Sequence, residues 1–302
     1  MAGKGNFLER LKAGEILCSD GAWATELQKM GLEPGGNPDE LNLTKPELPR
    51  QIARNYCEAG ADMILTNTFG SNGFRQRHYG LANKVKDLNI AGAKHSKEIA
   101  KEFGAFVVGS MGPSGEMVEP LGLVSNKEMY ENFLEQALAL KEGGVDAVVV
   151  ETIFALEELR QAVRAAKDAG LFTMATMTFD PGAFGFKTMW GVSTEQAARG
   201  MDEAGADVIG TNCGNGIDNM VKIVKEMRPH TKKPILVHSN AGVATKIVNG
   251  LPFYEETPEQ MAERVKDLAA AGAAIIGGCC GTTPEHVRRF RQEIDRLNQQ
   301  RK

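Results

Sequence analysis

The chain has 302 residues with 35 Lys or Arg and 39 Asp or Glu, so its formal net charge is −4. This balance gives no electrostatic reason to expect binding to nucleic acid or to an anionic membrane. No uninterrupted apolar stretch approaches the roughly 20 residues that a membrane-spanning helix requires, and the first residues lack the apolar segment of a signal peptide. Five cysteines in a chain of this length argue against a secreted disulfide scaffold, so we expect a cytoplasmic protein.

Eight short apolar runs predict β-strands. In chain order they are Ile16–Asp20, Met63–Thr68, Phe106–Met111, Ala147–Thr152, Phe172–Phe179, Val208–Cys213, Pro234–Asn240 and Ala274–Cys280. Several are nearly continuous in apolar residues, as is typical of parallel strands that are covered on both faces. Segments between them, such as Leu156–Ala166, repeat apolar residues at spacings of three and four and predict amphipathic helices.

A recurring joint between helix and strand indicates repeated βα units. It consists of a helix end, a glycine suited to a helix C-terminus and the start of a strand, and it precedes every even-numbered predicted strand. The four glycines of this joint are Gly60, Gly144, Gly205 and Gly272. Eight βα units close into a (βα)8 TIM barrel, which we predict as a single domain over residues 1–302. An open doubly wound sheet is the alternative architecture.

The C-terminal ends of the predicted strands carry the candidate site. Three long segments rich in Gly and Pro begin there, at 112–125, 180–193 and 241–258, and active sites of barrels lie at this face. The candidates for substrate binding are Asp20, Gly21, Ala22, Thr68, Ser110, Glu151 and Asn240. Because a carboxylate is costly to bury without a partner, Asp20 and Glu151 are expected to hold a substrate ammonium together. A helix N-cap or a structural ion pair is the alternative for either residue.

Three cysteines at predicted strand ends form a candidate zinc site. Cys213 ends one apolar run, and Cys279 and Cys280 end another, immediately before a helix start at Thr283 and Pro284. Successive strand side chains point to opposite faces, so the adjacent thiols reach one metal only if the backbone turns at the neighbouring glycines. Three thiolates without a nearby histidine pair favour Zn2+ with one coordination position open, which is a catalytic arrangement.

Other interpretations of the cysteines stay open. Cys213 is also compatible with a small buried residue, and Cys279–Cys280 with a chance pair or a vicinal disulfide, which a reducing cytoplasm disfavours. Cys18 and Cys57 lie within a predicted strand and a predicted helix, and we expect both to pack in the core.

His238 and Asn240 share one face of a predicted strand, because they are two residues apart. We expect the histidine to be a satisfied hydrogen-bonding residue and not a ligand. The asparagine offers a weak, displaceable oxygen to zinc.

The chain resembles the homocysteine S-methyltransferase family, a group of zinc-containing (βα)8 barrels, over nearly its whole length. Within the family it is most similar to the homocysteine-binding module of cobalamin-dependent methionine synthases. The segments that carry this similarity are Thr66–Gly70, Met111–Gly115, Asn240–Gly242 and Cys280–His286. The resemblance implies that Cys213, Cys279 and Cys280 bind zinc, with Asn240 as a fourth ligand in the absence of substrate. It also implies that Asp20 and Glu151 bind the homocysteine amino group.

The resemblance implies zinc-dependent transfer of a methyl group to the thiolate of homocysteine, giving methionine. Cobalamin-dependent methionine synthases continue into corrinoid modules, so we expect methylcobalamin or another methylcorrinoid on a separate protein as the donor. Alternatives are a small onium donor (betaine, S-methylmethionine or S-adenosylmethionine), another thiol acceptor, or a non-catalytic zinc and homocysteine-binding module of a larger complex. The apolar loop Phe184–Trp190 fits a corrinoid-protein docking surface or a lid over a small donor.

Overall fold

Eight parallel strands form the centre of this computed structural model, which describes residues 7–248 and 250–301. The strands are β1 (Leu17–Cys18), β2 (Met63–Leu65), β3 (Phe106–Met111), β4 (Ala147–Ile153), β5 (Thr173–Met177), β8 (Val208–Asn212), β9 (Ile235–Ser239) and β12 (Ala273–Gly278). They pair in the order β1-β12-β9-β8-β5-β4-β3-β2, so the two outermost strands are the first two in the chain. Between these strands, the Asp62 N–H donates a 2.8 Å hydrogen bond to the Cys18 carbonyl. The strands form a nearly closed barrel, and the predicted (βα)8 TIM fold is confirmed.

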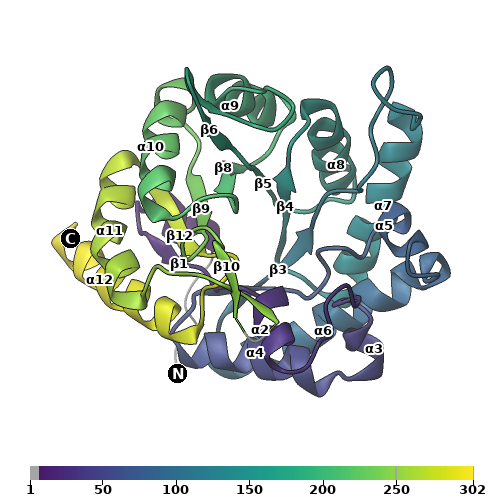
Figure 1. The fold of residues 1–302 in the computed structure, drawn as a ribbon, viewed down its shortest axis with the longest axis horizontal. Helices are drawn as coiled ribbons and strands as arrows, with labels where there is room; N and C mark the ends of the chain where they lie inside the picture. The colour runs from purple at the N-terminus through teal and green to yellow at the C-terminus, as the bar shows by residue number, and fades with distance from the viewer. Residues whose placement is uncertain (1–6, 249, 302) are drawn as a thin grey trace.

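Helices surround the barrel on its outside, as Figure 1 shows. One covering helix follows each barrel strand: α4 (Glu47–Glu58), α6 (Val85–Phe103), α7 (Asn126–Gly143), α8 (Leu156–Asp168), α9 (Thr194–Glu203), α10 (Ile217–Met227), α11 (Pro258–Ala271) and α12 (Pro284–Gln300). Shorter helices are α1 (Phe7–Lys12), α2 (Ala24–Lys29), α3 (Leu41–Thr44), α5 (Gly73–Arg77), and the 3-10 turns η1 (Ala82–Lys84) and η2 (Arg228–His230). Within the described residues, no helix combines the length and apolar character needed to cross a membrane.

The ends of the covering helices follow from the local sequence. The glycines of the predicted joint all have positive φ, from 89° to 108°: Gly60, Gly144, Gly205 and Gly272. Side chains disfavour this conformation, which explains glycine at each helix end. At the start of α12, Thr283 is the N-cap and forms a capping box with His286, and Pro284 is the first helical residue. The predicted joints and the predicted start of the last helix are confirmed.

Apolar side chains that alternate along the strands fill the interior of the barrel. The buried ones are Leu17, Met63, Leu65, Val108, Ala147, Val149, Met174, Val208, Leu236 and Ile275. Phe7 of α1 closes the N-terminal end, where its ring packs edge-on against Phe106 and Phe172 with centroid distances of 5.3 and 5.8 Å. The filled interior leaves the C-terminal ends of the strands as the place for a site.

Strand lengths and two hairpins differ from the sequence prediction. β1, β2 and β5 are each three residues shorter than predicted, because the ladder pairing ends before the predicted bounds. Two of the long loop segments contain an antiparallel hairpin that the prediction missed: β6 (Asp180–Gly182) with β7 (Gly185–Lys187), and β10 (Lys246–Val248) with β11 (Leu251–Phe253). The dipeptide Asn249-Gly250 between apolar residues is the sequence signal for the second hairpin.

Candidate metal centre and substrate pocket

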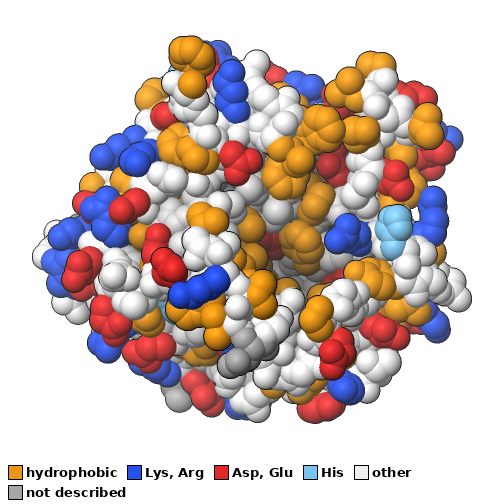
Figure 2. Space-filling view, viewed as in Figure 1, with side chains coloured by type: hydrophobic (Ala, Val, Ile, Leu, Met, Phe, Trp, Pro, Cys, Tyr) orange, Lys and Arg blue, Asp and Glu red, His pale blue; other side chains and the backbone are white. Residues whose placement is uncertain are grey.

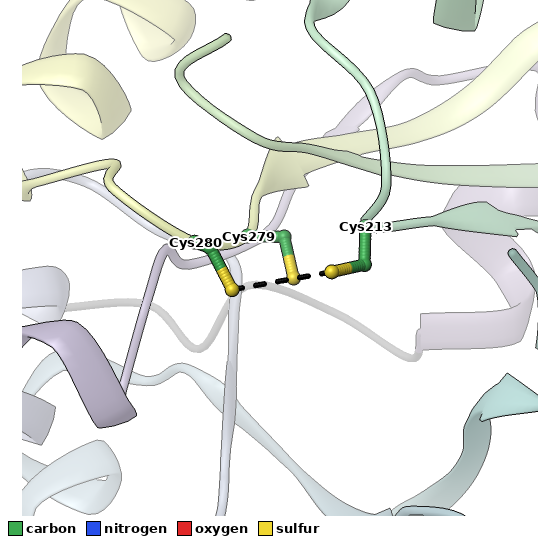
Figure 3. Close-up of side chains that lie close together, drawn as sticks. All are labelled: Cys213, Cys279 and Cys280. Atoms are coloured by element: carbon green, nitrogen blue, oxygen red, sulfur yellow. Dashed lines mark hydrogen bonds between the residues drawn. The ribbon is translucent and has the colours of Figure 1, made fainter. Parts of the chain in front are cut away.

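Three cysteine side chains converge at the C-terminal ends of β8 and β12 (Figure 3). Cys213 follows β8, Cys279 and Cys280 follow β12, and the three sulfur atoms lie within 4.8 Å of one another. Cys213 Sγ and Cys280 Sγ are 3.9 Å apart. Among residues 7–248 and 250–301, these cysteines are the only group of three or more His, Cys, Asp or Glu side chains close enough to share a metal ion.

The end of β9 aligns the two cysteine segments, because β9 lies between β8 and β12 in the sheet. On one side, the Cys213 N–H donates to the His238 carbonyl at 3.0 Å. On the other side, the Cys279 N–H donates to the Ser239 carbonyl at 2.7 Å. Backbone hydrogen bonds to β9 therefore fix the positions of Cys213 and Cys279 relative to one another along the barrel axis.

The backbone turns sharply at both cysteine segments. Cys213 has a φ of 58°, in the left-handed region that residues with a side chain rarely occupy, and Gly214 follows with a φ of 75°. At the second segment, a Cβ on Gly278 would lie 2.2 Å from Thr282 Oγ1, so only glycine fits there. The turn that the adjacent thiols require lies at Cys280 and Gly281, where Gly281 has a φ of 81°, whereas Gly277 and Gly278 still belong to β12.

The acidities of the three thiols depend on one another. Hydrogen bonds from Cys279 and Cys280 lower the pKa of Cys213 to about 3. The same contacts with Cys213 raise the pKa values of Cys279 and Cys280. These contacts favour a negative charge at Cys213 that the two neighbouring thiols stabilise, and a divalent soft metal would take the place of the thiol protons that remain.

Asn240 places an amide beside the thiols. Its side chain hydrogen-bonds Cys213, which further lowers the pKa of that thiol. Its Oδ1 atom is buried and has no hydrogen-bond partner among the described residues. An orphaned oxygen next to three thiols fits the donor set of a four-coordinate zinc ion.

His238 lies in the wall of the same pocket but is not part of the metal cluster. It is buried, and its Nε2 atom lies 2.9 Å from Ser19 Oγ. Burial lowers its pKa to about 4. It is therefore a neutral, hydrogen-bonded residue at physiological pH.

Asp20 is completely buried and accepts hydrogen bonds from three groups. These are the Leu65 N–H at 2.7 Å, the Trp23 indole N–H at 2.8 Å and the Ser19 hydroxyl at 3.3 Å. Burial nevertheless raises the pKa of Asp20 to about 7.

Glu151 is the second buried carboxylate. It accepts hydrogen bonds from Ser110 Oγ at 2.5 Å and from Asn212 Nδ2 at 3.2 Å. Burial raises its pKa to about 7, and the negative charges of Asp20 and Cys213 add to this effect. Among the described residues, neither Asp20 nor Glu151 has a Lys or Arg partner, and neither caps a helix. Both structural alternatives for these carboxylates are therefore excluded in the described part of the chain.

A cavity of about 340 Å3 joins the thiols to the carboxylate region, at the hollow near the centre of Figure 2. Of the residues expected from the sequence, its wall contains Gly21, Ala22, Ser110, Glu151, Cys213, Cys279 and Cys280. Asp20, Thr68 and Asn240 lie outside this wall. Asp20 is bound to Trp23, a wall residue, and Thr68 donates a 2.8 Å hydrogen bond to the Ser110 carbonyl.

Several residues of the site were not expected from the sequence. Trp23, Phe69 and Tyr79 bring aromatic rings to the cavity wall. Tyr254 approaches from the 241–258 segment and hydrogen-bonds Cys280. No local pattern distinguishes these residues, because distant contacts set the course of the loops that carry them.

The fold and the site define a (βα)8 barrel with a candidate three-cysteine metal centre. The sequence model of the family described as homocysteine S-methyltransferase matches residues 17–294. The chain therefore belongs to the homocysteine S-methyltransferase family of enzymes, as its motifs predicted.

Relatives of this chain include two mycobacterial proteins. The chain is 33% identical, over 97% of its length, to the protein named methionine synthase of Mycobacterium leprae (strain TN). It is also 33% identical, over 90% of its length, to the protein of that name in Mycobacterium tuberculosis (strain ATCC 25618 / H37Rv). The chain spans about a quarter of the length of these relatives, 25% and 24% respectively.

Solved structures with the same fold include the homocysteine methyltransferase MmuM from Escherichia coli. Its metallated form matches with a TM-score of 0.79 at 20% identity, and its oxidized form with 0.78 at 22% identity. Both matches cover 95% of this chain and 99% of that chain. At this level of identity the likeness establishes the fold alone.

Proposed function

We propose that this protein transfers a methyl group to the sulfur of homocysteine, giving methionine, at a Zn2+ ion held by Cys213, Cys279 and Cys280. The observation that carries the proposal is one cavity whose wall combines three convergent thiols with the Glu151 carboxylate. Within the described residues that carboxylate has no cationic partner. Homocysteine has a thiol and an ammonium group that match these two features, and membership of the family supports the same reaction.

The protein's own groups bind the amino acid end of the substrate. Glu151 contacts the ammonium from the cavity wall, and the charge of Asp20 adds to the negative potential there. The backbone at Gly21 and Ala22 borders the cavity, and Tyr56 and Thr282 hold it in place. A Cβ on Gly21 would lie 2.8 Å from Thr282 Oγ1 and 2.9 Å from Tyr56 Oη, so glycine is required.

The sulfur end of the substrate meets the cysteines and Asn240. When bound, Zn2+ lowers the pKa of the substrate thiol so that it reacts as a thiolate. In the absence of substrate, the unpaired Oδ1 atom of Asn240 would hold the remaining position of the ion. A sulfur electron pair forms the new S–CH3 bond while the bond between methyl and donor breaks, and that bond's electron pair stays with the donor. The proton of the substrate thiol is released to water. The imidazole in the cavity wall, His238, is hydrogen-bonded to Ser19, and its low pKa of about 4 makes it too weak a base to take this proton.

The proposed donor is a methylcorrinoid carried by a separate protein. Large apolar side chains are exposed on three loops that follow barrel strands at the C-terminal face: Met117, Leu121, Leu123, Phe184, Met189, Trp190, Val243, Ile247 and Phe253. Figure 2 shows apolar side chains on this face beside the central hollow. Extended exposed apolar surface is typical of interaction sites, and its position suits a protein that presents a methyl group to the cavity.

A small onium donor is the second candidate. The observation that favours it is the set of aromatic rings of Trp23, Phe69 and Tyr79 in the cavity wall. Aromatic faces attract quaternary ammonium and sulfonium groups. In this case the methyl donor would enter the cavity and no partner protein would be needed.

The test is methionine formation from homocysteine by the zinc-loaded protein, with and without a zinc chelator. Chelator-sensitive methionine formation from free or protein-bound methylcobalamin, followed by the change in cobalamin absorbance, supports the corrinoid donor. Methionine from betaine, S-methylmethionine or S-adenosylmethionine alone identifies an onium donor. Binding of zinc and homocysteine without methionine from any donor identifies a binding module. If another thiol binds to the zinc-loaded protein more tightly than homocysteine in a competition assay, that thiol is the methyl acceptor.

A further inference from the structure

The side-chain amide of Asn212 connects the ends of three barrel strands. Asn212 is the last residue of β8 and is completely buried. Its Nδ2 group donates to Thr152 Oγ1 at 2.7 Å and to Glu151 Oε2 at 3.2 Å. Its Oδ1 atom accepts from the Thr152 N–H at 2.8 Å and from Thr176 Oγ1 at 2.7 Å. All four hydrogen-bonding positions of the amide are filled, and the N–H of Thr152 determines which end is the oxygen.

The two backbone segments joined by this amide are both strained. Thr152 has a φ of 61° and Cys213 a φ of 58°, and no other non-glycine residue in the described ranges has a positive φ. Thr152 is β-branched, which makes this conformation especially unfavourable. The pairing of β4 with β5 is also irregular between Val150 and Ile153. Such strain persists only where surrounding contacts hold it, and Asn212 provides these contacts at Thr152.

Asn212 therefore stands between the two halves of the candidate site. Its side chain binds the Glu151 carboxylate, and its own carbonyl is followed in the chain by Cys213, one of the three cluster thiols. The link between carboxylate and thiol consists of one rigid amide and one peptide unit. A short link of this kind keeps their separation constant.

We propose that Asn212 is a positioning residue that sets the distance between the ammonium-binding carboxylate and the metal-binding thiols. This inference rests on the proposed function. It makes Asn212 a determinant of specificity, because cysteine and homocysteine differ by one methylene between the amino-bearing carbon and the sulfur. If the distance between the carboxylate and the thiols is fixed, the site accepts homocysteine and excludes the shorter cysteine. If this distance varies, the site accepts both amino acids.

The experiment compares Asn212→Ala with Asn298→Ala as a matched control. The Asn298 amide makes two hydrogen bonds to the Ile16 backbone, outside the candidate site. Zinc content is measured first. Calorimetry then gives the dissociation constants of the zinc-loaded proteins for homocysteine, for cysteine and for 4-mercaptobutanoate, which is homocysteine without its amino group. Binding is read directly, so no methyl donor is needed.

In Asn212→Ala, we expect the dissociation constant for homocysteine to rise about tenfold, as for loss of a hydrogen bond to a charged group. The value for 4-mercaptobutanoate should change less than about twofold, and the preference for homocysteine over cysteine should shrink. Asn298→Ala should retain wild-type selectivity. Equal weakening of both homocysteine and its analogue, or no change in either, would overturn the inference. A wild-type protein that binds zinc but does not prefer homocysteine would instead refute the proposed function.

A milder variant decides the matter if Asn212→Ala does not fold or does not retain zinc. Thr152→Val keeps the branched side chain but removes the hydroxyl that accepts the shortest N–H bond of Asn212. We expect homocysteine binding to weaken about threefold, as for one neutral hydrogen bond, with 4-mercaptobutanoate binding unchanged. Equal effects on the two ligands would contradict a positioning role.

Discussion

The Thr282 hydroxyl donates a 2.7 Å hydrogen bond to the carbonyl oxygen of Cys279. The same hydroxyl accepts a 3.1 Å hydrogen bond from the Ala22 N–H. One buried side chain therefore connects the cysteine turn after β12 to the loop after β1. These are the last and the first strands of the barrel in the chain. This bond couples the metal centre to the border of the substrate pocket.

Thr282→Val tests this coupling. Valine has the same shape but leaves the Ala22 N–H without its partner and the Cys279 carbonyl with only the Thr282 N–H, at 3.1 Å. We therefore expect a loss of about 1–3 kcal/mol in the free energy of unfolding and weaker zinc binding. Urea unfolding and chelator competition measure the two quantities. The control is Thr245→Val, which changes an exposed threonine bonded to Glu255. Equal effects of the two substitutions would argue against a special role for Thr282.

Cys213→Ala should lose bound zinc and, with it, methionine formation. The substitution removes one of the three thiol ligands and leaves only two, too few to hold the ion against dialysis. The control Cys57→Ala changes a buried cysteine of α4 outside the cluster, and zinc content should stay near one ion per chain, about that of the unaltered protein. Metal analysis after dialysis gives the answer, and full zinc with full turnover in Cys213→Ala would exclude the proposed centre.

Homocysteine should bind more weakly as the pH falls from 8 to 6. Asp20 and Glu151 have pKa values of about 7 because they are buried, so below pH 7 they take up protons and lose the charge that attracts the ammonium. The thiol of the ligand also binds a proton as the pH falls. Because 4-mercaptobutanoate has this thiol but no ammonium group, its affinity shows the effect of thiol protonation alone. The ratio of the affinity for homocysteine to the affinity for 4-mercaptobutanoate should decline by up to about tenfold for each pH unit below the pKa of the carboxylates. A ratio that is independent of pH would separate these carboxylates from ammonium binding.

Glu151→Gln should stabilise the protein at pH 8 in the absence of substrate. The pKa of Glu151 is higher in the folded state than in the unfolded state, so its contribution is most favourable at low pH and is lost as the pH rises through about 7. Above that pH the neutral amide avoids a cost on the order of 2–3 kcal/mol. The gain in unfolding free energy should be smaller at pH 5 than at pH 8. The control Glu263→Gln alters an exposed side chain, and a gain of the same size there would contradict the interpretation.

Phe184→Ser tests the proposed docking of a corrinoid protein. Phe184 is 93% exposed, so its replacement should change stability by less than about 0.5 kcal/mol and leave homocysteine binding unchanged. The rate with a protein-bound methylcorrinoid should fall several-fold, whereas the rate with free methylcobalamin should not. Leu138→Ser, an exposed leucine on the covering helix α7, is the control. Equal rates for both variants with the protein-bound donor would argue against docking at this loop.

Much of the fold was predictable from local patterns. Gly60, Gly144, Gly205 and Gly272 signalled helix ends because only glycine adopts positive φ at low cost, and Thr283-Pro284 signalled a helix start through capping. In a parallel barrel all strands end on one side. The sequence therefore predicts that the thiols of Cys213, Cys279 and Cys280 lie on one rim of the barrel.

The details of the site depended on contacts between distant segments. The absence of a cationic partner for Glu151 in the described residues, the four hydrogen bonds of Asn212 and the orphaned oxygen of Asn240 each involve elements that lie far apart in the chain. Their geometry follows from strand register and loop packing. The sequence by itself determined which residues form the strands, the helix ends and the thiol motif, because each of these follows from interactions among near neighbours. Only the tertiary structure decided which polar atoms share the pocket and which remain unpaired, because burial and hydrogen-bond pairing are properties of the assembled barrel.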